Sequence, residues 1–209
     1  MTKVKLHFGC GDNKLRGWIN VDRDRHPKPD VIADLRDPIP FRSQSVDILH
    51  SEDFVDQLEL DRAYQFFTEC HRILKRGGMM RVLTPDLHEF ARRYVNGDAA
   101  LLRLWKEQVG IPLRTKTLCE LFNLGMRLGG HTFLYDEETL FHVLRECGFE
   151  PKKVSYRESE DADLRGLDLR SPETGVSLYV EARKRDLGRG EDPSPKRGWI
   201  KSLLTWRWR

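Results

Sequence analysis

Near the N-terminus a short apolar strand runs directly into a Gly-X-Gly turn, and this junction limits the fold more than any other feature of the sequence. The strand is predicted over residues 4–8, and Gly9, Cys10 and Gly11 follow it. Glycine lacks a Cβ atom, so two glycines let the backbone turn sharply and let a ligand lie against main-chain N–H groups. The pattern predicts a ligand pocket at the carboxyl end of this strand.

Two apolar runs downstream of the turn each end in a carboxylate. The runs over residues 19–21 and 31–33 have the length of buried strands, and Asp22 and Asp34 follow them directly. An open α/β sheet binds nucleosides in the crevice along the carboxyl ends of its strands. The glycine turn followed by two carboxylates in this order therefore indicates a nucleoside pocket. A Gly-X-Gly turn without these carboxylates would be much weaker evidence.

The chain up to residue 184 continues this pattern. Further strands are predicted over four ranges: 46–49, 79–83, 154–156 and 176–182. Two helices are predicted to begin at Asp61 and Asp136, because each acid can cap a helix and is followed by apolar residues at helical spacing. Residues 87–130 are amphipathic and helical, and are predicted to form an inserted cap. We therefore expect an α/β fold with a Rossmann-like, mostly parallel sheet of seven strands.

The first two connections between parallel strands are unusually short. The segments from Gly11 to Trp18 and from Asp22 to Val31 are shorter than the dozen or so residues that a crossover normally needs. Both crossovers are therefore expected to be reduced, with their helices lost. One flank of the sheet should then be open to solvent or covered by another part of the chain, such as the C-terminal tail.

Composition points to a cytoplasmic protein that does not bind nucleic acid. Apolar residues make up 39% of the chain and charged residues 33%, and no apolar run is long enough to span a membrane or to form a signal peptide. The net charge of +3 is too small to indicate a nucleic-acid partner. The four cysteines lie far apart without zinc spacing, so we expect reduced thiols in or near the core and no metal site.

The basic charge is concentrated in the C-terminal tail. Residues 184–209 hold eight Lys or Arg against three Asp or Glu. Residues 185–198 are rich in Gly, Pro and charge and are predicted to be a flexible linker. Residues 199–209 combine three tryptophans with basic residues, so this amphipathic segment could lie on an anionic membrane surface. The alternative, which we favour, is that it packs on its own sheet or on a partner chain in an oligomer.

Taken together, these motifs resemble class I S-adenosylmethionine-dependent methyltransferases. The resemblance is closest to a compact subgroup associated with sugar and cell-surface polysaccharide pathways. It covers roughly residues 4–184, and its clearest segments are 6–11, 17–22, 34–35, 40–41, 69–78, 84–87 and 131–148. It implies a methyltransferase-like domain over residues 1–184, with the cap at residues 87–130 inserted in it.

The resemblance implies that seven residues bind S-adenosylmethionine: Gly9, Cys10, Gly11, Asp22, Asp34, Leu35 and Ser51. The glycine turn would hold the methionine part of the cofactor. The carboxylate of Asp22 would accept hydrogen bonds from both ribose hydroxyls, since it offers two acceptor oxygens. Asp34 and Leu35 would bind adenine, and Ser51 would lie beside the reactive methyl group.

The sequence departs from the family pattern in three places. Many relatives carry an acid two positions before the first glycine to bind the cofactor's ammonium group, whereas this chain has His7. Relatives also carry histidines in the segment that follows the fourth strand, where this chain has Asp53 and Gln57. A histidine base in that segment is therefore excluded.

Four residues are candidates for catalysis: Glu52, Asp53, His131 and Tyr135. Glu52 and Asp53 follow the fourth strand, where a base for a hydroxyl acceptor must lie within hydrogen-bond reach. His131 and Tyr135 flank the exit of the cap and could face the substrate. The alternative for the acids is a helix-capping pair, and for His131 and Tyr135 a structural role.

The leading hypothesis is transfer of a methyl group from S-adenosylmethionine to an oxygen or nitrogen atom of a small acceptor, such as a sugar or glycan intermediate. A nicotinamide-dependent oxidoreductase fits poorly, because it needs a third glycine where Lys14 stands and an acid further along the chain than Asp22. A third hypothesis is an S-adenosylmethionine-binding protein that no longer transfers methyl groups and acts as an interaction or membrane-tethered subunit.

Overall fold

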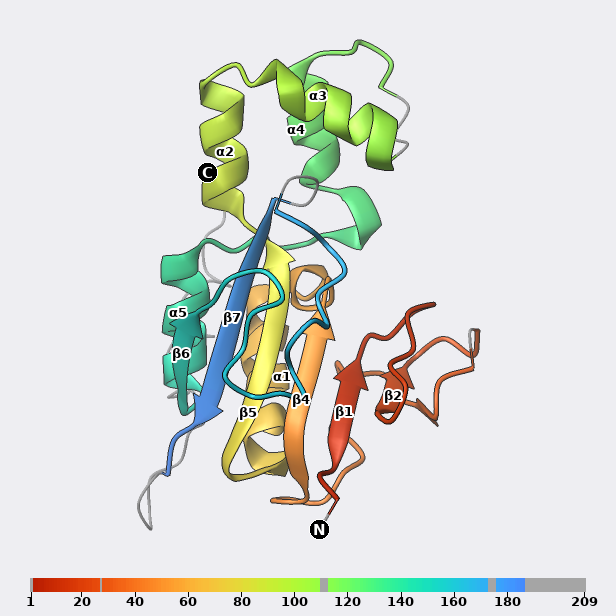
Figure 1. Ribbon diagram of the computed structural model, residues 1–209, viewed down its shortest axis with the longest axis vertical. Coiled ribbons are helices and arrows are strands. Elements are labelled where there is room, and N and C mark those ends of the chain that lie inside the picture. The colour runs from red at the N-terminus through yellow and green to blue at the C-terminus, as the bar shows by residue number, and fades with distance from the viewer. Residues whose placement is uncertain (1, 27, 110–112, 173–175, 187–209) are drawn as a thin grey trace, which may run out of the picture.

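The computed structural model describes residues 2–26, 28–109, 113–172 and 176–186 (Figure 1). Seven strands form one sheet in the order β3-β2-β1-β4-β5-β7-β6. Their bounds are β1 (Lys5–Phe8), β2 (Ile19–Asp22), β3 (Val31–Ile32), β4 (Val46–Glu52), β5 (Leu74–Pro85), β6 (Phe149–Lys153) and β7 (Ser177–Lys184). The first five strands are parallel, and β7 runs antiparallel to both β5 and β6. The predicted seven-stranded, mostly parallel sheet is confirmed.

The strand order reverses at β1. The chain leaves β1 on one side to form β2 and β3, and later returns to place β4 on the other side. Ligands of open α/β sheets bind in the crevice at the carboxyl ends of strands where such a reversal occurs. The glycine turn after β1 and the residues after β4 therefore lie at the expected ligand site.

Two helices, α1 (Leu60–Ile73) and α5 (Glu137–Glu146), cover one face of the sheet (Figure 1). The predicted cap of α5 is confirmed, since the carboxylate of Asp136 accepts a hydrogen bond from the N–H of Thr139 at 2.8 Å. The predicted cap of α1 is wrong. The N-cap of α1 is Glu59, whose side chain makes no capping hydrogen bond. Asp61 lies in the first turn, where its negative charge interacts favourably with the positive end of the helix dipole.

The sixth strand lies earlier in the chain than predicted. The sequence pattern placed it at residues 154–156, but β6 starts at Phe149, directly after the turn at Gly148. β6 is an edge strand and pairs only with β7, so it can hold Pro151 and two lysines that a central strand would not accept. The apolar alternation that reveals a buried strand is therefore missing from β6.

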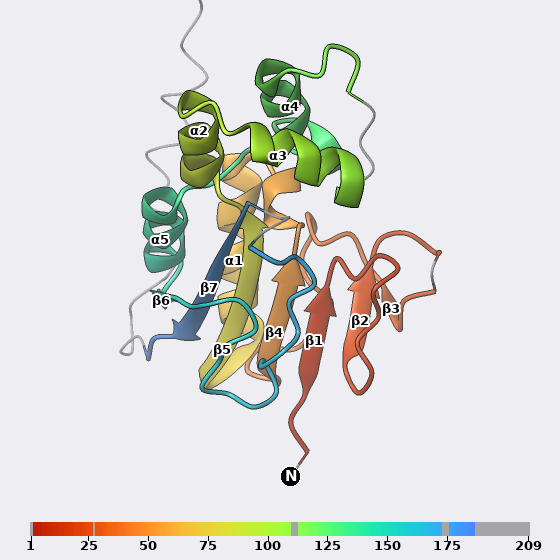
Figure 2. The same ribbon diagram turned by 45° about the horizontal axis from the view of Figure 1, so that its top comes forward.

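A long connection between β6 and β7 covers the opposite face of the sheet. The crossovers after β1 and β2 contain no helix in the described residues, as expected. Residues 154–172 cross that flank instead (Figure 2). Leu164 is fully buried there against Trp18, Ile48 and Met79. The flank predicted to be open or covered by the tail is thus covered by the connection that the sequence analysis treated as a polar loop.

One buried arginine fixes this connection to the sheet. Arg81 of β5 is fully buried and holds the carboxylate of Asp168 with its Nε and Nη2 atoms, at 2.7 and 2.5 Å. Its Nη1 atom donates to Glu181 of β7 at 2.8 Å. The backbone carbonyls of Ser155 and Glu158 accept further hydrogen bonds from the same guanidinium. A buried charge is tolerated only when it is paired and hydrogen-bonded in this way.

A buried histidine at the end of α1 gives the fold a pH dependence. His71 packs edge-on against Phe149, with ring centroids 5.4 Å apart, and its Nε2 atom has no hydrogen-bond partner among the described residues. Burial, together with the nearby charge of Lys184, lowers its pKa to about 4. The unfolded chain keeps the ordinary pKa of 6.5, so it binds more protons than the folded protein between pH 6.5 and 4.

We expect the protein to lose about 2 kcal/mol of stability as the pH falls from 6.5 to 4 through this histidine alone. The variant His71→Leu should lose less stability over that interval, because it has no group to protonate there. Urea unfolding of both proteins at several pH values measures the difference. His26→Gln, which changes an exposed loop histidine, should behave like the unaltered protein, and a parallel decline in His71→Leu would contradict the assignment.

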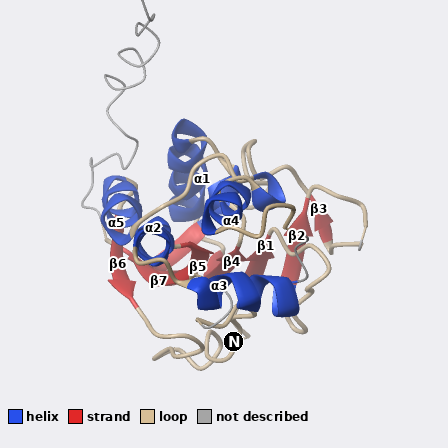
Figure 3. Cartoon of the chain, turned by 90° about the horizontal axis from the view of Figure 1, so that it is seen from above, coloured by secondary structure: helices blue, strands red, loops and turns tan. Residues whose placement is uncertain are grey.

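The cap lies over the carboxyl ends of the strands (Figures 1 and 3). Its elements are α2 (Leu87–Val95), α3 (Ala99–Leu104), η2 (Trp105–Val109), α4 (Leu118–Gly125) and η3 (Leu128–Gly130). They share a small core of their own, centred on Phe90, Leu101, Trp105 and Leu121. A Cβ atom at Gly125 would lie 2.5 Å from the ring of Phe90, so the glycine lets α4 pack directly on α2.

Several predictions fall outside this description or differ from it. Residues 187–209 lie outside the described residues, and they hold the whole predicted tail and all but the first two residues of the predicted linker (185–198). Cys10, Cys70 and Cys147 are buried as expected, but Cys119 is exposed on α4.

None of the helices in the described part of the chain is long and apolar enough to cross a membrane.

Candidate functional site

The glycine turn is held between β2 and the segment that follows β4. The N–H groups of Gly9 and Cys10 both donate to the carbonyl of Val21, at 3.0 and 3.3 Å. Gly9 has a φ of +64°, and a Cβ atom there would lie 3.1 Å from the Cβ atom of Phe54. A side chain at position 9 would therefore be strained in its backbone and crowded by Phe54.

Asp22 closes the turn from the end of β2. One carboxylate oxygen, Oδ2, accepts a hydrogen bond from the N–H of Gly11 at 2.9 Å, and the other accepts from the N–H of Asp24 at 3.0 Å. Each carboxylate oxygen has a second acceptor position, so the group can still accept hydrogen bonds from two ligand hydroxyls.

Asp34 and Leu35 follow β3, the strand that pairs with β2 on the side away from β1. Arg36 holds the carboxylate of Asp34 through its backbone N–H and its guanidinium, and this lowers the pKa of Asp34 to about 2. Asp34 is therefore ionised at neutral pH. Leu35 is buried and contributes to the main core, while it also lines a cavity in front of Asp34.

The first cavity brings five of the predicted cofactor residues together. It has a volume of about 230 Å³, and its predicted members are Gly9, Gly11, Asp22, Asp34 and Leu35. Ala33, Phe54 and Leu58 add apolar wall to this set of acceptors. A nucleoside needs acceptors for its ribose hydroxyls and an apolar slot for its base, so the lining fits the adenosine half of S-adenosylmethionine.

A second cavity of about 240 Å³ lies on the other side of the turn and shares Gly9, Gly11 and Asp53 with the first. Cys10 lines it, and burial raises the pKa of its thiol to about 11, so the thiol is neutral there. Ser51 is buried and lines neither cavity. The structure thus brings Cys10 to the site but does not bring Ser51 into it.

His7 lines the second cavity as a neutral ring. It is buried beside His50, with ring centroids 5.1 Å apart, and its Nδ1 atom lies 3.3 Å from Oδ1 of Asn20. Burial lowers the pKa of His7 below its ordinary value. His7 therefore carries no charge at neutral pH that would repel the ammonium group of a bound amino acid.

The acids of this cavity are Glu52 and Asp53. The carboxylate of Glu52 accepts hydrogen bonds from the backbone N–H groups of Leu169 and Arg170, at 3.2 and 3.0 Å. Asp53 forms an ion pair with the guanidinium of Arg170, and its Oδ1 atom has no partner among the described residues. Burial raises the pKa of both carboxyl groups above their ordinary values.

Asp53 also has an unusual backbone. Its φ of +52° lies in the left-handed region, which a residue other than glycine rarely adopts, and such conformations are concentrated at functional sites. Gln57 stabilises this turn, because its Nε2 atom donates to the carbonyl of Asp53 at 2.7 Å. Two of the three positions that depart from the family pattern, Asp53 and Gln57, therefore contact one another.

His131 pairs with an acid that the sequence analysis missed. Its Nε2 atom lies 3.1 Å from Oδ2 of Asp56, an ion-pair contact. Its Nδ1 atom lies 2.9 Å from the carbonyl of Gly125 and must donate there, because a carbonyl only accepts. Burial raises the pKa of Asp56, and the neighbouring His131 opposes this rise. Asp56 lies on the short helix η1 (Val55–Gln57), and no periodic pattern in the sequence marked it.

Tyr135, the fourth catalytic candidate, is fully buried in the main core beside Phe133. Its hydroxyl has no hydrogen-bond partner among the described residues, and burial raises its pKa well above the ordinary value. Tyr135 lines none of the cavities around the glycine turn. Of the four catalytic candidates, Glu52, Asp53 and His131 therefore line cavities, whereas Tyr135 is buried in the core.

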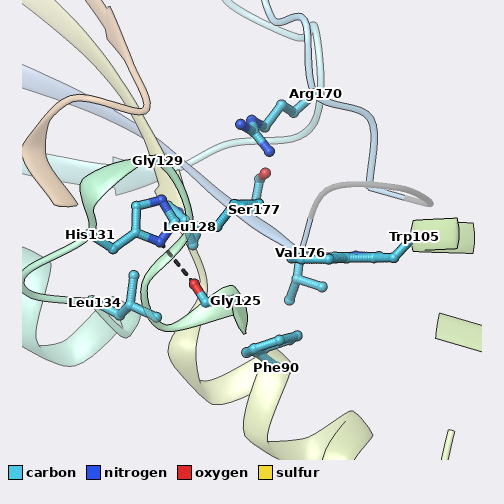
Figure 4. Close-up of a pocket in the computed structure, with 11 residues that line it drawn as sticks. Phe90, Trp105, Gly125, Leu128, Gly129, His131, Leu134, Arg170, Val176 and Ser177 are labelled. Carbon is cyan, nitrogen blue, oxygen red and sulfur yellow. Dashed lines mark hydrogen bonds between the residues drawn. The ribbon is translucent and has the colours of Figure 1, made fainter. Parts of the chain in front are cut away.

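A third cavity, the cap cavity, lies between the cap and the sheet (Figure 4). Its volume is about 60 Å³. Its lining consists of Pro85, Phe90, Trp105, Gly125, Leu128, Gly129, His131, Leu134, Arg170, Val176 and Ser177. The rings of Phe90 and Trp105 are stacked, with centroids 5.7 Å apart. Arg170 lines both this cavity and the second one, so these two cavities are neighbours.

Comparison with known proteins agrees with this geometry. The protein family described as "Methyltransferase domain" matches residues 13–82. No curated protein sequence matches the chain.

Solved structures share its fold at low sequence identity. An S-adenosylmethionine-dependent methyltransferase from Thermotoga maritima, described as a possible histamine N-methyltransferase, has 17% identity and a TM-score of 0.52, over 88% of this chain and 84% of that one. An S-adenosylmethionine-dependent methyltransferase from Archaeoglobus fulgidus has 14% identity and a TM-score of 0.52, over 87% and 86%. One from Mesorhizobium loti has 16% identity and a TM-score of 0.52, over 87% and 91%.

The fold is that of the solved S-adenosylmethionine-dependent methyltransferases, and residues 13–82 match a methyltransferase domain. Together these findings support an enzyme of that type. S-adenosylmethionine is the cofactor that this domain implies, and the residues of the first two cavities fit it.

Proposed function

We propose that this protein transfers a methyl group from S-adenosylmethionine to an oxygen or nitrogen atom of a small acceptor, a saccharide or glycan intermediate. The cofactor would occupy the two cavities beside the glycine turn, and the acceptor would enter the cap cavity. The observation that carries this proposal is that the three cavities lie next to one another and share lining residues. Asp53 is shared by the first two, and Arg170 by the second and third.

The chain's main task would be to position two reactants. Bound S-adenosylmethionine supplies an electrophilic methyl group on a sulfonium sulfur. Asp22 and the glycine turn would hold the nucleoside, and the second cavity would receive the methionine half, whose ammonium group would meet a neutral ring at His7. Orienting two reactants at contact distance supplies much of the rate enhancement in reactions of this type.

The acceptor must also lose a proton, and Asp53 is the best-placed candidate to take it, because both ring nitrogens of His131 already face Asp56 and the carbonyl of Gly125. Oδ1 of Asp53 has no partner among the described residues, and burial raises the pKa of this carboxyl group, which makes it a better base when ionised. His131 lines the cap cavity and is paired with Asp56. Glu52 is engaged by two backbone N–H groups, so we assign it the role of holding residues 169–170.

Aromatic rings and donors in the cap cavity support a saccharide acceptor. Sugars present an apolar ring face and many hydroxyl groups, and ligand sites commonly combine aromatic walls with a few polar groups. Phe90 and Trp105 supply the aromatic wall, and Ser177, His131 and Arg170 the polar groups.

S-adenosylhomocysteine is expected to bind this protein, and NADH is not. The reason is that Asp22 lies beside the glycine turn itself, and Lys14 stands where a dinucleotide site needs its third glycine. Isothermal titration calorimetry with both ligands measures this. Tighter binding of NADH would overturn the methyltransferase assignment, and binding of S-adenosylhomocysteine without methyl transfer to any saccharide would favour an inactive cofactor-binding subunit.

A further inference from the structure

We propose that the acceptor carries an anionic oxygen group, a carboxylate or a phosphate, which Arg170 and the indole N–H of Trp105 bind in the cap cavity. This proposal rests on the proposed function, and it defines the acceptor more narrowly as an acidic sugar.

The lining of the cap cavity offers donors and a positive charge but no acid. None of the described residues that line it is Asp or Glu, whereas both cavities around the glycine turn contain carboxylates. The guanidinium of Arg170 and the hydroxyl of Ser177 face one another across the cavity (Figure 4). A cavity of this composition complements a ligand with negative charge.

Trp105 supplies a buried donor that is left unused. Its side chain is stacked on Phe90 and only 8% of the residue is exposed, yet its Nε1 atom has no hydrogen-bond partner among the described residues. A buried indole N–H usually has a partner, and leaving a buried donor unpaired costs free energy. An acceptor oxygen of a ligand in the cap cavity would satisfy this donor.

The backbone of Arg170 is fixed while its side chain stands between two cavities. Its N–H donates to Glu52 at 3.0 Å, and its carbonyl accepts from the hydroxyl of Tyr179 at 2.7 Å. The guanidinium pairs with Asp53 in the described structure and also lines the cap cavity. An anionic acceptor would draw this guanidinium away from Asp53 and leave the acid available as the base.

Three sugars with the same ring test the proposal: glucuronate, glucose 6-phosphate and glucose. With saturating S-adenosylhomocysteine, at least one of the two acidic sugars should bind about 10- to 100-fold more tightly than glucose, which is the usual effect of a hydrogen bond to a charged group. The tighter ligand distinguishes a carboxylate from a phosphate. Binding of the tighter ligand should also shift the NMR resonance of the indole N–H of Trp105. This resonance can be assigned because it is missing from the spectrum of Trp105→Phe.

Variants of two arginines on the same segment complete the test. Arg170→Gln should lose most of the preference for the acidic sugar, so that its affinities for the acidic sugar and for glucose become similar. Arg165→Gln is the control, because Arg165 binds the carbonyl of Ser159 and lines none of the three cavities. If neither acidic sugar binds more tightly than glucose, or if Arg170→Gln keeps the preference, the proposal is wrong. Failure to bind S-adenosylhomocysteine would instead refute the proposed function.

Discussion

Replacing Asp168 with alanine should lower the free energy of unfolding by about 3–5 kcal/mol, because the change leaves the guanidinium of Arg81 buried without its main counter-charge. Both side chains are completely buried, so water cannot replace the lost partner. The N–H of Arg157 would also lose its acceptor, Oδ2 of Asp168, at 2.6 Å. Urea unfolding followed by circular dichroism measures the loss, which is a large fraction of the roughly 5–15 kcal/mol that stabilises a typical domain.

Asp163→Ala is the matched control for this change. Asp163 lies on the same segment and pairs with Lys3 and Lys5, but these pairs are partly exposed to solvent. Exposed ion pairs contribute less than about 1 kcal/mol, so the control should unfold almost like the unaltered protein. Equal losses in the two variants would show that burial of the Arg81 pair does not set its contribution.

Replacing Asp22 with alanine should weaken the binding of S-adenosylhomocysteine by roughly 1.5–3 kcal/mol, which is about a 10- to 150-fold loss of affinity. Two ribose hydroxyls would be left unpaired, and the N–H of Gly11 would lose its acceptor in the turn. Calorimetry measures the affinity, and a melting curve without ligand checks that the fold is kept.

Two further variants test whether the loss of affinity comes from the hydrogen-bond acceptors of Asp22. Asp22→Asn keeps one side-chain oxygen as an acceptor and should lose less affinity than Asp22→Ala. Asp37→Ala removes an exposed acid that lines neither cavity beside the glycine turn, and it should bind the ligand normally. Unchanged affinity in Asp22→Ala would mean that the ribose lies elsewhere.

Much of the sheet could be predicted because its strands are marked locally. The parallel strands β1, β4 and β5 are buried on both faces, so they read as apolar runs whose ends are set by glycine, acids or proline. β6 was misplaced because an edge strand needs no such run. Its register is set by pairing with β7, which lies more than twenty residues further along the chain.

The candidate site also contains residues that the sequence predicts and residues that it does not. Gly9, Gly11, Asp22, Asp34 and Leu35 were predictable because a short sequence pattern carries them, and one cavity does contain them all. Arg170 and Trp105 were not predictable. Arg170 reaches Glu52 and Asp53 across more than a hundred residues, through a connection without periodicity. Trp105, on η2, acquires its place only when η2 packs against α2 within the cap.

The segment that covers the sheet also determines when the site can form. Leu167, Leu169 and Arg170 wall the second cavity, and their segment is held there because Asp168 binds Arg81 of β5, which lies 87 residues earlier in the chain. A growing polypeptide that has reached residue 150 already contains the glycine turn and Asp22 but lacks this wall of the second cavity, where we propose that the methionine half of the cofactor binds. Contacts between such distant residues form late in folding. Cofactor affinity should therefore emerge only after β7 has joined the sheet, so that ligand binding reports on completion of the chain.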